Sequence, residues 1–588
     1  MRKTALYILV ILLFLTPYAF AQDQASQSSI WFGDIAAPLS LSGQDQASIM
    51  KILSECLLSG SKVSNSKFPD AVSTDMGKRI VFVSLFDGKS RAQIFRGEGL
   101  GLSSAINCAL TRIASQPDAP KKWSGVRLDI VRSARMLDNK LVPLEPGLNG
   151  LATGSQQAVA VLADELIADG CVRDDGDVKW DKVAFLIERH GLKIYDISSH
   201  TIDLMKIAYT FTTDSLYTDG RNVMPLYRGH TANVQVTSSN LLQAVKAGGD
   251  YLKWSLDPNG RFTYNYMAGS DKTDKAYNYV RHAGTIYAMC EVYGVTGDRS
   301  LLVPIRSAID YLMRLKKSSG NALYLADKSD STSLGCNALA ALALAEYTMV
   351  TKDRRYVPTI IKLGRWIEMC ENDSGEFVHK VCVPSQKALP DTCSYYPGEA
   401  TFALMRIAKV DKQSHWITSA QKAAKNIIAG YAKVKDDDLP NDQWFLYALN
   451  ELYRVKPKSE YMSCARRLVR AEIVSQTTKS DHPDEIGLLR GKLVSNITAV
   501  EGLCAAYAMM RDYGSKNDAD AIKKSLQSAV RYQMQLQYRK ESSGYLPNPR
   551  HALGGVTKSF ANTTIRIDTV QHFLSGCIQY YKIIKPKS

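Results

Sequence analysis

The stretch Ala288-Met-Cys-Glu-Val-Tyr293 decides the fold, because variants of it end a helical pattern six times along the chain. The next copy is Ala343-Leu-Ala-Glu-Tyr347. The other four copies are Ala403-Leu-Met-Arg-Ile407, Ala448-Leu-Asn-Glu-Leu-Tyr453, Ala508-Met-Met-Arg-Asp-Tyr513 and Ser575-Gly-Cys-Ile-Gln-Tyr-Tyr581. Their first residues are 45 to 67 positions apart, a period typical of repeat architectures. Each copy is therefore interpreted as the second helix of a helical pair.

The first helix of each pair has apolar residues three and four positions apart with charges between them, the pattern of a helix with one solvated face. These outer helices are expected at Ser239–Leu256, Leu301–Lys317, Tyr356–Glu371, Trp416–Ala432, Tyr461–Gln476 and Asp518–Tyr538. The second helices are apolar or small nearly all round, as expected when both sides are covered. Six hairpins that close into a ring predict an all-α (α/α)6 toroid over residues 238–588, with the longer loops gathered at the inner-helix N-termini.

The chain before residue 238 has a different texture, so we predict a multidomain protein. Residues 1–21 read as a secretory signal peptide, with Arg2 and Lys3 before an apolar run and Ala19-Phe20-Ala21 at the cleavage site. Residues 22–44 form a flexible lead-in, residues 45–208 an α+β domain and residues 209–237 a connector. The mature chain is expected to be exported, periplasmic or secreted, with no stable membrane span after signal cleavage.

Two resemblances to known families follow from these patterns. The hairpin repeat resembles the six-hairpin glycosidase superfamily, whose members are mostly glycoside hydrolases, with polysaccharide lyases and sugar epimerases on related toroids. That resemblance implies a carbohydrate-active enzyme. In the α+β region, Pro143-Leu-Glu-Pro-Gly-Leu-Asn-Gly150 and the helix that begins at Trp180 resemble part of the AMMECR-type domain, whose glycine–cysteine motif is missing here. No site residue is carried over from that family.

Composition narrows the possible partners. An apolar content of 45% with 22% charged residues is typical of a globular protein rather than a disordered one. The net charge of +15 favours anionic partners such as uronic-acid polymers, although a diffuse solubilising surface explains it equally. No basic block is interleaved with aromatic residues, so nucleic acid is not an expected partner. The 11 cysteines show no metal-ligand spacing, and no cofactor or metal is predicted. Cys382 and Cys393 are placed where a disulfide is possible.

Three inner-helix starts carry residue types suited to chemistry. The first contains Arg281 and His282, which we expect to face the cavity, where arginine would grip a carboxylate or phosphate and histidine would exchange a proton. The third contains Glu399 in its first turn, a position suited either to general acid–base work or simply to the helix dipole. The last contains Asp568 and His572, four residues apart and therefore on one face, so that Asp568 would orient His572 or act itself.

Glu399 and Asp568 are the best candidates for an acid and base pair. Hairpins three and six face each other across a six-fold ring, and an inverting glycosidase holds its carboxyl groups about 6.5–9.5 Å apart. The candidate catalytic residues are thus Glu399, Asp568 and His572. The candidate substrate-binding residues are Tyr264, Tyr266, Tyr279, Arg281, His282, Tyr395, Tyr396, Asp442, Trp444, Arg566 and Gln571. Trp254 and Trp366 lie within expected outer helices and are interpreted as core.

The sequence leaves three functions open. The leading hypothesis is an exported glycoside hydrolase that acts on a polysaccharide or cell-envelope glycan with two carboxylates across the mouth. The second is a uronic-acid lyase or epimerase, which would use Arg281 or Arg566 as a cation and a Tyr or His to move the C5 proton. The third is a non-catalytic glycan-binding or assembly subunit, which would depend on aromatic residues such as Trp444.

Overall fold

The computed structural model describes residues 32–59, 67–116, 123–137, 143–153, 159–191, 208–232, 234–327, 331–383, 385 and 387–586. The expected signal peptide, residues 1–21, lies outside them. The chain divides into two compact units. One comprises Met1–Ser84, Ile94–Ala119 and Leu128–Ser215, and the other comprises Leu85–Gln93, Pro120–Arg127 and Leu216–Ser588. The expected fold class, an α+β region followed by a helical toroid, is confirmed.

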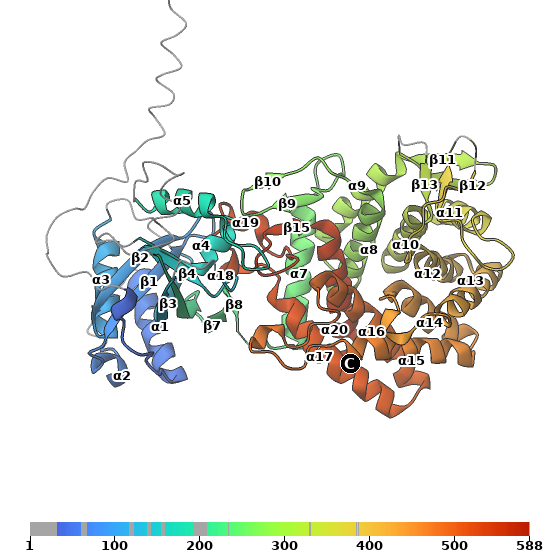
Figure 1. Cartoon of the computed structure of the whole chain (residues 1–588). Coiled ribbons are helices and arrows are strands. Elements are labelled where there is room, and N and C mark those ends of the chain that lie inside the picture. Colours follow the sequence, from blue (N-terminus) through green and yellow to red (C-terminus); the bar gives the residue numbers. More distant parts are fainter. Residues whose placement is uncertain are drawn as a thin grey trace, which may run out of the picture. The chain divides into compact units, whose positions relative to one another are not determined.

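The α+β region is built on a sheet of strand order β2-β1-β3-β6-β4-β5, with β7 and β8 off this path (Figure 1). The strands are β1 Lys78–Phe86, β2 Gln93–Leu100, β3 Gly125–Met136, β4 Gly150–Thr153, β5 Ala160–Val161, β6 Ala208–Thr218, β7 Val223–Tyr227 and β8 His230–Thr231. The accompanying helices are η1 Phe32–Asp34, α1 Gly43–Leu57, α2 Asp70–Ser73, α3 Leu102–Ala114, α4 Ala163–Ala168 and α5 Trp180–Arg189. The β-branched and aromatic run at β1 and the alternation of apolar and polar residues at β3 account for these two strands.

The segment expected as a connector differs from that expectation. Residues 208–218 form β6, which lies between β3 and β4 in the sheet, and residues 223–227 form β7. Its many Thr, Asp and Gly residues suggest a linker, but Thr and Tyr are also favourable in strands. The start of the helical part at α7 agrees with the pattern of the repeat.

The helical part is a closed ring of six inner helices. They are α8 Tyr279–Thr296, α10 Leu334–Thr351, α12 Tyr396–Asp411, α14 Gln443–Val455, α16 Leu493–Tyr513 and α20 Ile567–Ile584. Each packs on the next in chain order, and α20 packs on both α16 and α8, which closes the ring (Figure 1). The outer helices are α7 Ser238–Trp254, α9 Leu302–Met313, α11 Val357–Met369, α13 His415–Tyr431, α15 Ser459–Val474 and α17 Lys516–Gln535. The helical part is therefore an (α/α)6 toroid.

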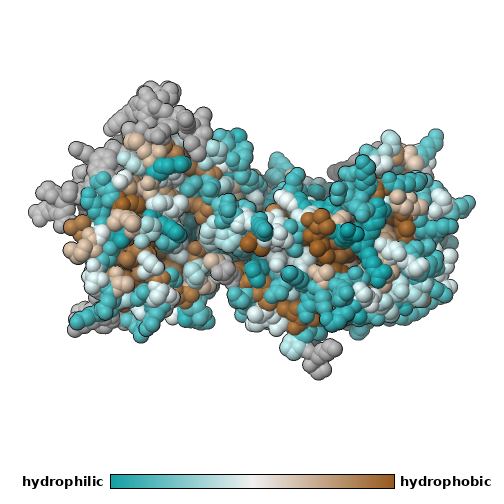
Figure 2. Space-filling model, turned by 60° about the horizontal axis from the view of Figure 1, so that its bottom comes forward, coloured by the Kyte–Doolittle hydropathy of each residue, from teal (hydrophilic) through white to brown (hydrophobic). Residues whose placement is uncertain are grey.

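The two rings differ in burial in the way their sequences predict. Outer helices bury one stripe of residues, such as Trp366 of α11 at 1% exposure, and keep charged residues on the other side. The view in Figure 2 shows hydrophilic residues over most of the drawn face, with hydrophobic residues in separate patches. Inner helices α10 and α16 are long and apolar enough to cross a membrane by length and composition. Both are largely buried inside the ring, which accounts for that hydropathy.

Short strands and turns occupy the loops that lead into the inner helices. They are β9 Asn265–Met267, β10 Lys272–Thr273, β11 Lys316–Ser319, β12 Ala322–Leu325, β13 Ser331–Ser333, β14 Lys380–Cys382 and β15 Thr564–Arg566. Short helical segments are η2 Arg299–Leu301, η3 Asp436–Asp438, η4 Pro483–Glu485, α18 Lys540–Ser543 and α19 Pro549–Ala552. Cys382 and Cys393, both described, are not joined by a disulfide bond.

Candidate active site at the inner-helix N-termini

A two-stranded pairing joins the first and last hairpins at the mouth, by which we mean the end of the ring formed by the inner-helix N-termini. Strand β15 pairs antiparallel with β9, with Ile565 opposite Tyr266 and Arg566 opposite Asn265. The Ile567 amide also donates to the Tyr264 carbonyl at 3.2 Å. This pairing brings the start of α20 beside the start of α8, although the two are almost 290 residues apart in sequence.

Four predicted residues meet there: Tyr264, Arg281, Arg566 and Asp568. Asp568 Oδ2 lies 2.8 Å from Arg281 Nε and 2.8 Å from Arg566 Nη2, and Arg566 Nε also contacts Asp568 Oδ1. Arg281 Nη1 donates to the Tyr264 hydroxyl. The Asp568 side chain is 9% exposed and that of Arg281 37%, so the pairing is partly shielded from water and stronger than an exposed ion pair.

A third cation stands near this group. Burial lowers the pKa of the Lys558 ammonium, and repulsion from Arg566 and Arg281 lowers it further against the opposing pull of Asp568. We call Tyr264, Arg281, Lys558, Arg566 and Asp568 the mouth cluster. It holds three basic side chains and one acidic one, beside the N-termini of two helices, whose amide dipoles add positive potential. The cluster is thus suited to binding an anionic group.

His572 lies one helical turn deeper and does not pair with Asp568. Its Nδ1 lies 2.6 Å from Oε1 of Glu501 on α16, and the Tyr447 hydroxyl donates to Glu501 Oε2 at 3.3 Å. The expectation that Asp568 orients His572 is therefore wrong. Asp568 pairs with Arg281 and Arg566, and the carboxylate that contacts His572 is Glu501 on the neighbouring helix. A histidine fixed through Nδ1 by a carboxylate keeps its second nitrogen for proton exchange.

Glu399 lies on α12, which is opposite α20 in the ring order, as expected. Its side chain is 4% exposed and packs against α10, where a Cβ on Gly335 would lie 2.5 Å from Glu399 Oε2. That oxygen has no hydrogen-bond partner among the described residues. Burial first, and then the nearby Asp442 carboxyl, raise the pKa of Glu399 well above its usual value. Glu399 is thus a carboxyl group whose surroundings favour its protonated form, and it packs against a neighbour rather than opening to the mouth.

Asp442 and Trp444, at the start of α14, have different environments from those expected. Asp442 is the N-cap of the helix, accepts from the Phe445 amide at 3.0 Å and from the Tyr431 hydroxyl at 2.7 Å, and is 3% exposed. Burial raises its pKa to about 6. Trp444 is 2% exposed, with ring centroids 6.1 Å from His572 and 6.2 Å from Tyr287. Trp444 is therefore buried beneath the mouth, and its ring is not exposed for a sugar to stack on.

His282 points away from the mouth, contrary to expectation. It is fully buried, its Nε2 lies 2.9 Å from the Ala308 carbonyl on outer helix α9, and its Nδ1 lies 2.6 Å from the Tyr277 hydroxyl. Burial lowers its pKa to about 4, so it does not exchange protons near neutral pH. Tyr279 packs on Tyr277 at 5.3 Å. These residues tie the loop to the outer helix.

The remaining predicted residues are distributed around the same end of the ring. Tyr395 is 51% exposed and interacts electrostatically with Arg281, so it borders the mouth cluster. Tyr396 packs on His379 at 6.1 Å, and Gln571 is buried between α20 and α8 against Gly284. Tyr266 is 2% exposed and turns outward, where its hydroxyl donates to Asp271 at 2.7 Å. Tyr266 is therefore separate from Arg281.

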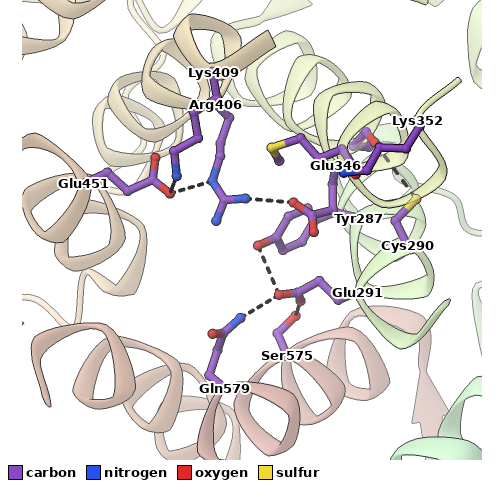
Figure 3. A network of polar contacts seen from close by, with 12 residues as sticks. Tyr287, Cys290, Glu291, Glu346, Lys352, Arg406, Lys409, Glu451, Ser575 and Gln579 are labelled. Carbon is purple, nitrogen blue, oxygen red and sulfur yellow. Dashed lines mark hydrogen bonds and ion pairs between the residues drawn. The ribbon is translucent and has the colours of Figure 1, made fainter. Parts of the chain in front are cut away.

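A network of charged and polar residues fills the ring below Trp444 and was not predicted. In Figure 3, labelled side chains from α8, α10, α12, α14 and α20 converge on the centre of the ring. Arg406 Nη1 lies 2.8 Å from Glu346 Oε2, and its Nε lies 2.7 Å from Glu451 Oε1. Glu291 accepts hydrogen bonds from Ser575 at 2.6 Å and from Gln579 at 2.6 Å. Burial raises the pKa of Glu291 to about 7.

The sequence contained a signal for this network. Five of the six repeat copies carry one residue of this network at their mostly apolar end: Glu291, Glu346, Arg406, Glu451 and Gln579. An isolated charge on a helix that is covered on all sides must find a partner inside. Glu501, the partner of His572, is a similar isolated charge in the apolar run of α16. In the part of the chain that the structure describes, no three His, Cys, Asp or Glu residues form a metal-binding group.

The fold and the site define a six-hairpin (α/α)6 toroid with a cationic mouth and a histidine–glutamate pair beneath it. Solved structures similar to this chain include a D-mannose isomerase, with 14% identity and a TM-score of 0.47, matched over 60% of this chain and 98% of that chain. A cellobiose 2-epimerase from Spirochaeta thermophila has 13% identity and a TM-score of 0.45, over 59% and 97%. The GH76A α-1,6-mannanase of Salegentibacter sp. has 12% identity and a TM-score of 0.42, over 59% and 100%.

All three TM-scores are below 0.5, and the (α/α)6 ring is defined here by the packing of this chain's own helices. No model of a known protein family matches the chain. No curated protein sequence matches it either. The activity is therefore inferred from the side chains of the site.

Proposed function

We propose that the toroid is a carbohydrate-active enzyme, a glycoside hydrolase that acts on an acidic polysaccharide or cell-envelope glycan. The observation that carries the proposal is a pair of carboxyl groups in opposite environments on opposite inner helices. Glu399 is buried, and its pKa is raised well above the usual value. Asp568 is paired as an ion with Arg281 and Arg566. Two carboxyl groups whose surroundings differ in this way suit the acid and base roles of glycoside hydrolysis.

In this mechanism the protonated Glu399 donates its proton to the leaving glycosidic oxygen. Asp568, which carries the negative charge, accepts a proton from the water that attacks the anomeric carbon. Arg281, Arg566 and Lys558 bind an acidic group of the substrate next to the bond that breaks. The substrate would have to reach Glu399 past Tyr395 and Tyr396, which requires side-chain movement at the start of α12.

A second candidate, a uronic-acid lyase or epimerase, is favoured by the basic excess of the mouth cluster and by the His572–Glu501 pair. A cation paired with the uronate carboxylate stabilises the negative charge that develops when the C5 proton leaves. His572, fixed by Glu501 at 2.6 Å, would take that proton. In this reaction Glu399 has no chemical role, so the two candidates differ in the residue on which they depend.

Turnover by single variants of the mature chain separates the candidates. Purified protein would be incubated with polygalacturonate, alginate and a neutral glucan. New reducing ends without absorbance of unsaturated uronates support hydrolysis, unsaturated products support a lyase, and solvent deuterium at C5 without cleavage supports an epimerase. For the hydrolase, Glu399→Gln and Asp568→Asn each lower kcat by about 10²-fold or more.

Surface substitutions of the same chemistry provide the controls. Glu460→Gln and Asp437→Asn change exposed carboxylates on α15 and η3 and should leave turnover unchanged. Full activity of the Glu399→Gln variant together with inactivity of a His572→Asn variant would overturn the hydrolase and favour proton abstraction. Binding of a glycan without any product would reduce the mouth cluster to ligand contacts, as in a binding or assembly subunit.

We also propose that the protein is exported, periplasmic or secreted. Support comes from Arg2, Lys3 and the Ala19-Phe20-Ala21 cleavage pattern in the sequence. The mass of the protein recovered from cell fractions tests the proposal. Recovery outside the cytoplasm with the N-terminus at Gln22 supports it, and recovery of an uncleaved cytoplasmic chain contradicts it.

A further inference from the structure

A cavity of about 1020 Å³ lies on the outer side of the ring, separate from the mouth cluster. Its walls come from outer helix α7, from residues 537–554 and from the segment around β7 and β8, and no inner-helix residue lines it among those described. The volume is at the upper end of the range of about 300–1,000 Å³ that holds small ligands. We call it the α7 cavity.

One wall of the α7 cavity is aromatic. Trp254, at the last turn of α7, is 40% exposed, so its interpretation as a core residue is wrong. Its ring stacks on His551 at 4.6 Å and 28° and meets the edge of Tyr266 at 5.2 Å. Asp271 holds His551 in this stack, because Asp271 Oδ1 lies 3.2 Å from His551 Nδ1 and accepts the Tyr266 hydroxyl at 2.7 Å. The indole is thus fixed in place while part of it faces solvent.

The other wall is basic. Arg539, Lys540, Arg550 and His551 line the cavity, and Asp250 is its one acidic residue. Asp250 lies 2.6 Å from Lys253 Nζ, so its charge is already compensated. Guanidinium groups pair with carboxylate, sulfate or phosphate through two parallel hydrogen bonds. An anionic group would therefore be attracted to this side of the cavity.

A buried hydroxyl completes the site. Tyr251 lines the cavity at 2% exposure, and its hydroxyl has no hydrogen-bond partner among the described residues. Buried polar groups without partners are uncommon, because each costs free energy that a hydrogen bond would recover. Arg and His side chains, an aromatic face and an unpartnered hydroxyl together match a ring with hydroxyls and one acidic group.

We propose that the α7 cavity is a second binding site for an acidic saccharide unit, distinct from the site at the mouth. The indole of Trp254 packs on the sugar ring, and Arg539 and Arg550 pair with its carboxylate. The identification of the ligand as a glycan rests on the proposed function, whereas the position and charge of the site do not. The site would hold a long acidic chain at a distance from the bond that is cut.

Calorimetric binding of a galacturonate trimer to the full mature chain tests the proposal. Trp254→Ala and Arg550→Ala should each weaken binding by about tenfold, the value of one lost charge-assisted or stacking contact. Both side chains are at least partly exposed, so neither change leaves a core cavity. Tyr513→Ala, at 48% exposure on α16, and Lys246→Ala, on α7 but outside the cavity, are the matched controls and should bind as the wild type does.

Three results would overturn the proposal: unchanged affinity in both cavity variants, equal affinity for a neutral galactose trimer, or displacement of the trimer by AMP, which would indicate a nucleotide site. Failure of the proposed function has a different signature. If Glu399→Gln and Asp568→Asn leave turnover intact while Trp254→Ala weakens trimer binding, the assignment of the mouth fails and the α7 cavity stands. If instead Glu399→Gln and Asp568→Asn abolish turnover while Trp254→Ala binds the trimer normally, the proposal for the α7 cavity fails and the assignment of the mouth stands.

Discussion

Glu291 shows how a single buried carboxyl group sets a pH dependence for the whole ring. Its pKa rises from 4.5 to about 7, mainly by burial. Below pH 4.5 the group is protonated in both the folded and the unfolded state, so it does not lower the free energy of unfolding. Between pH 4.5 and about 7 the unfolded chain releases the proton while the folded chain keeps it, and the free energy of unfolding falls. Above about pH 7 both states are ionised and the loss is complete.

Glu291→Gln removes this dependence. Relative to the wild type, the variant should gain up to about 3 kcal/mol in free energy of unfolding between pH 4 and pH 8, from the difference between 4.5 and about 7. Urea unfolding at the two pH values measures the gain, with Glu460→Gln as the exposed control. A constant difference between Glu291→Gln and wild type across this window would show that burial does not hold the proton on Glu291.

Glu501 acts through His572 and is a positioning residue for the lyase or epimerase reaction, in which His572 takes the proton. Glu501→Gln keeps a hydrogen-bond acceptor but removes the charge that faces His572 at 2.6 Å. If His572 moves a proton, kcat should fall by about 10-fold or more with KM changed little, since the substrate contacts remain. Steady-state kinetics on the substrate found in the screen measure this split, and Glu501→Asp should restore part of kcat. A fall in stability without a change in kcat would make the pair purely structural.

At the scale of elements, the outer helices and the ring order could be predicted, and the orientation of individual side chains could not. The six outer helices begin within two residues of their expected starts, because one solvated face imposes a clear period. Inner helices that are covered on every side have no such period. Whether His282 faces the ring or the outer layer therefore depends on which neighbour accepts its hydrogen bond.

The candidate site divides in the same way. Arg281, Arg566 and Asp568 were predicted as residues, but their meeting depends on the β9–β15 pairing, which joins segments almost 300 residues apart. Glu501 and Lys558 have no local motif, so only the fold shows what they contact. Residues 208–218 contain Thr and Tyr, which favour strands, and also Asp and Ser, which are common in linkers. They form strand β6 because they pair between β3 and β4 in the sheet.

Close packing of α10 on α12 gives a prediction at this scale. A methyl group at Gly335 would lie 2.4 Å from Tyr396 Cε1 and 2.5 Å from Glu399 Oε2. Gly335→Ala should therefore lower the free energy of unfolding by about 1–3 kcal/mol and displace Glu399. Gly430→Ala on α13, where nothing lies within 4 Å, should be neutral or stabilising by up to about 1 kcal/mol. Thermal unfolding of the two variants side by side measures the contrast, and equal midpoints would show that the α10–α12 contact yields without strain.

At the scale of the whole molecule, a net charge of +15 surrounds a mouth cluster with three basic residues and one acidic residue. A long acidic glycan would be attracted by this positive potential along many of its sugar units, whereas a neutral glycan would not. Raising NaCl from about 0.05 M to about 0.5 M shortens the screening length severalfold, so KM for the acidic polymer should rise at least about threefold while kcat changes little. Initial rates across the salt range test this, with a neutral glycan of equal length as the control. A KM that does not respond to salt would mean that the positive charge serves only to keep the surface solvated, and that recognition depends on uncharged contacts.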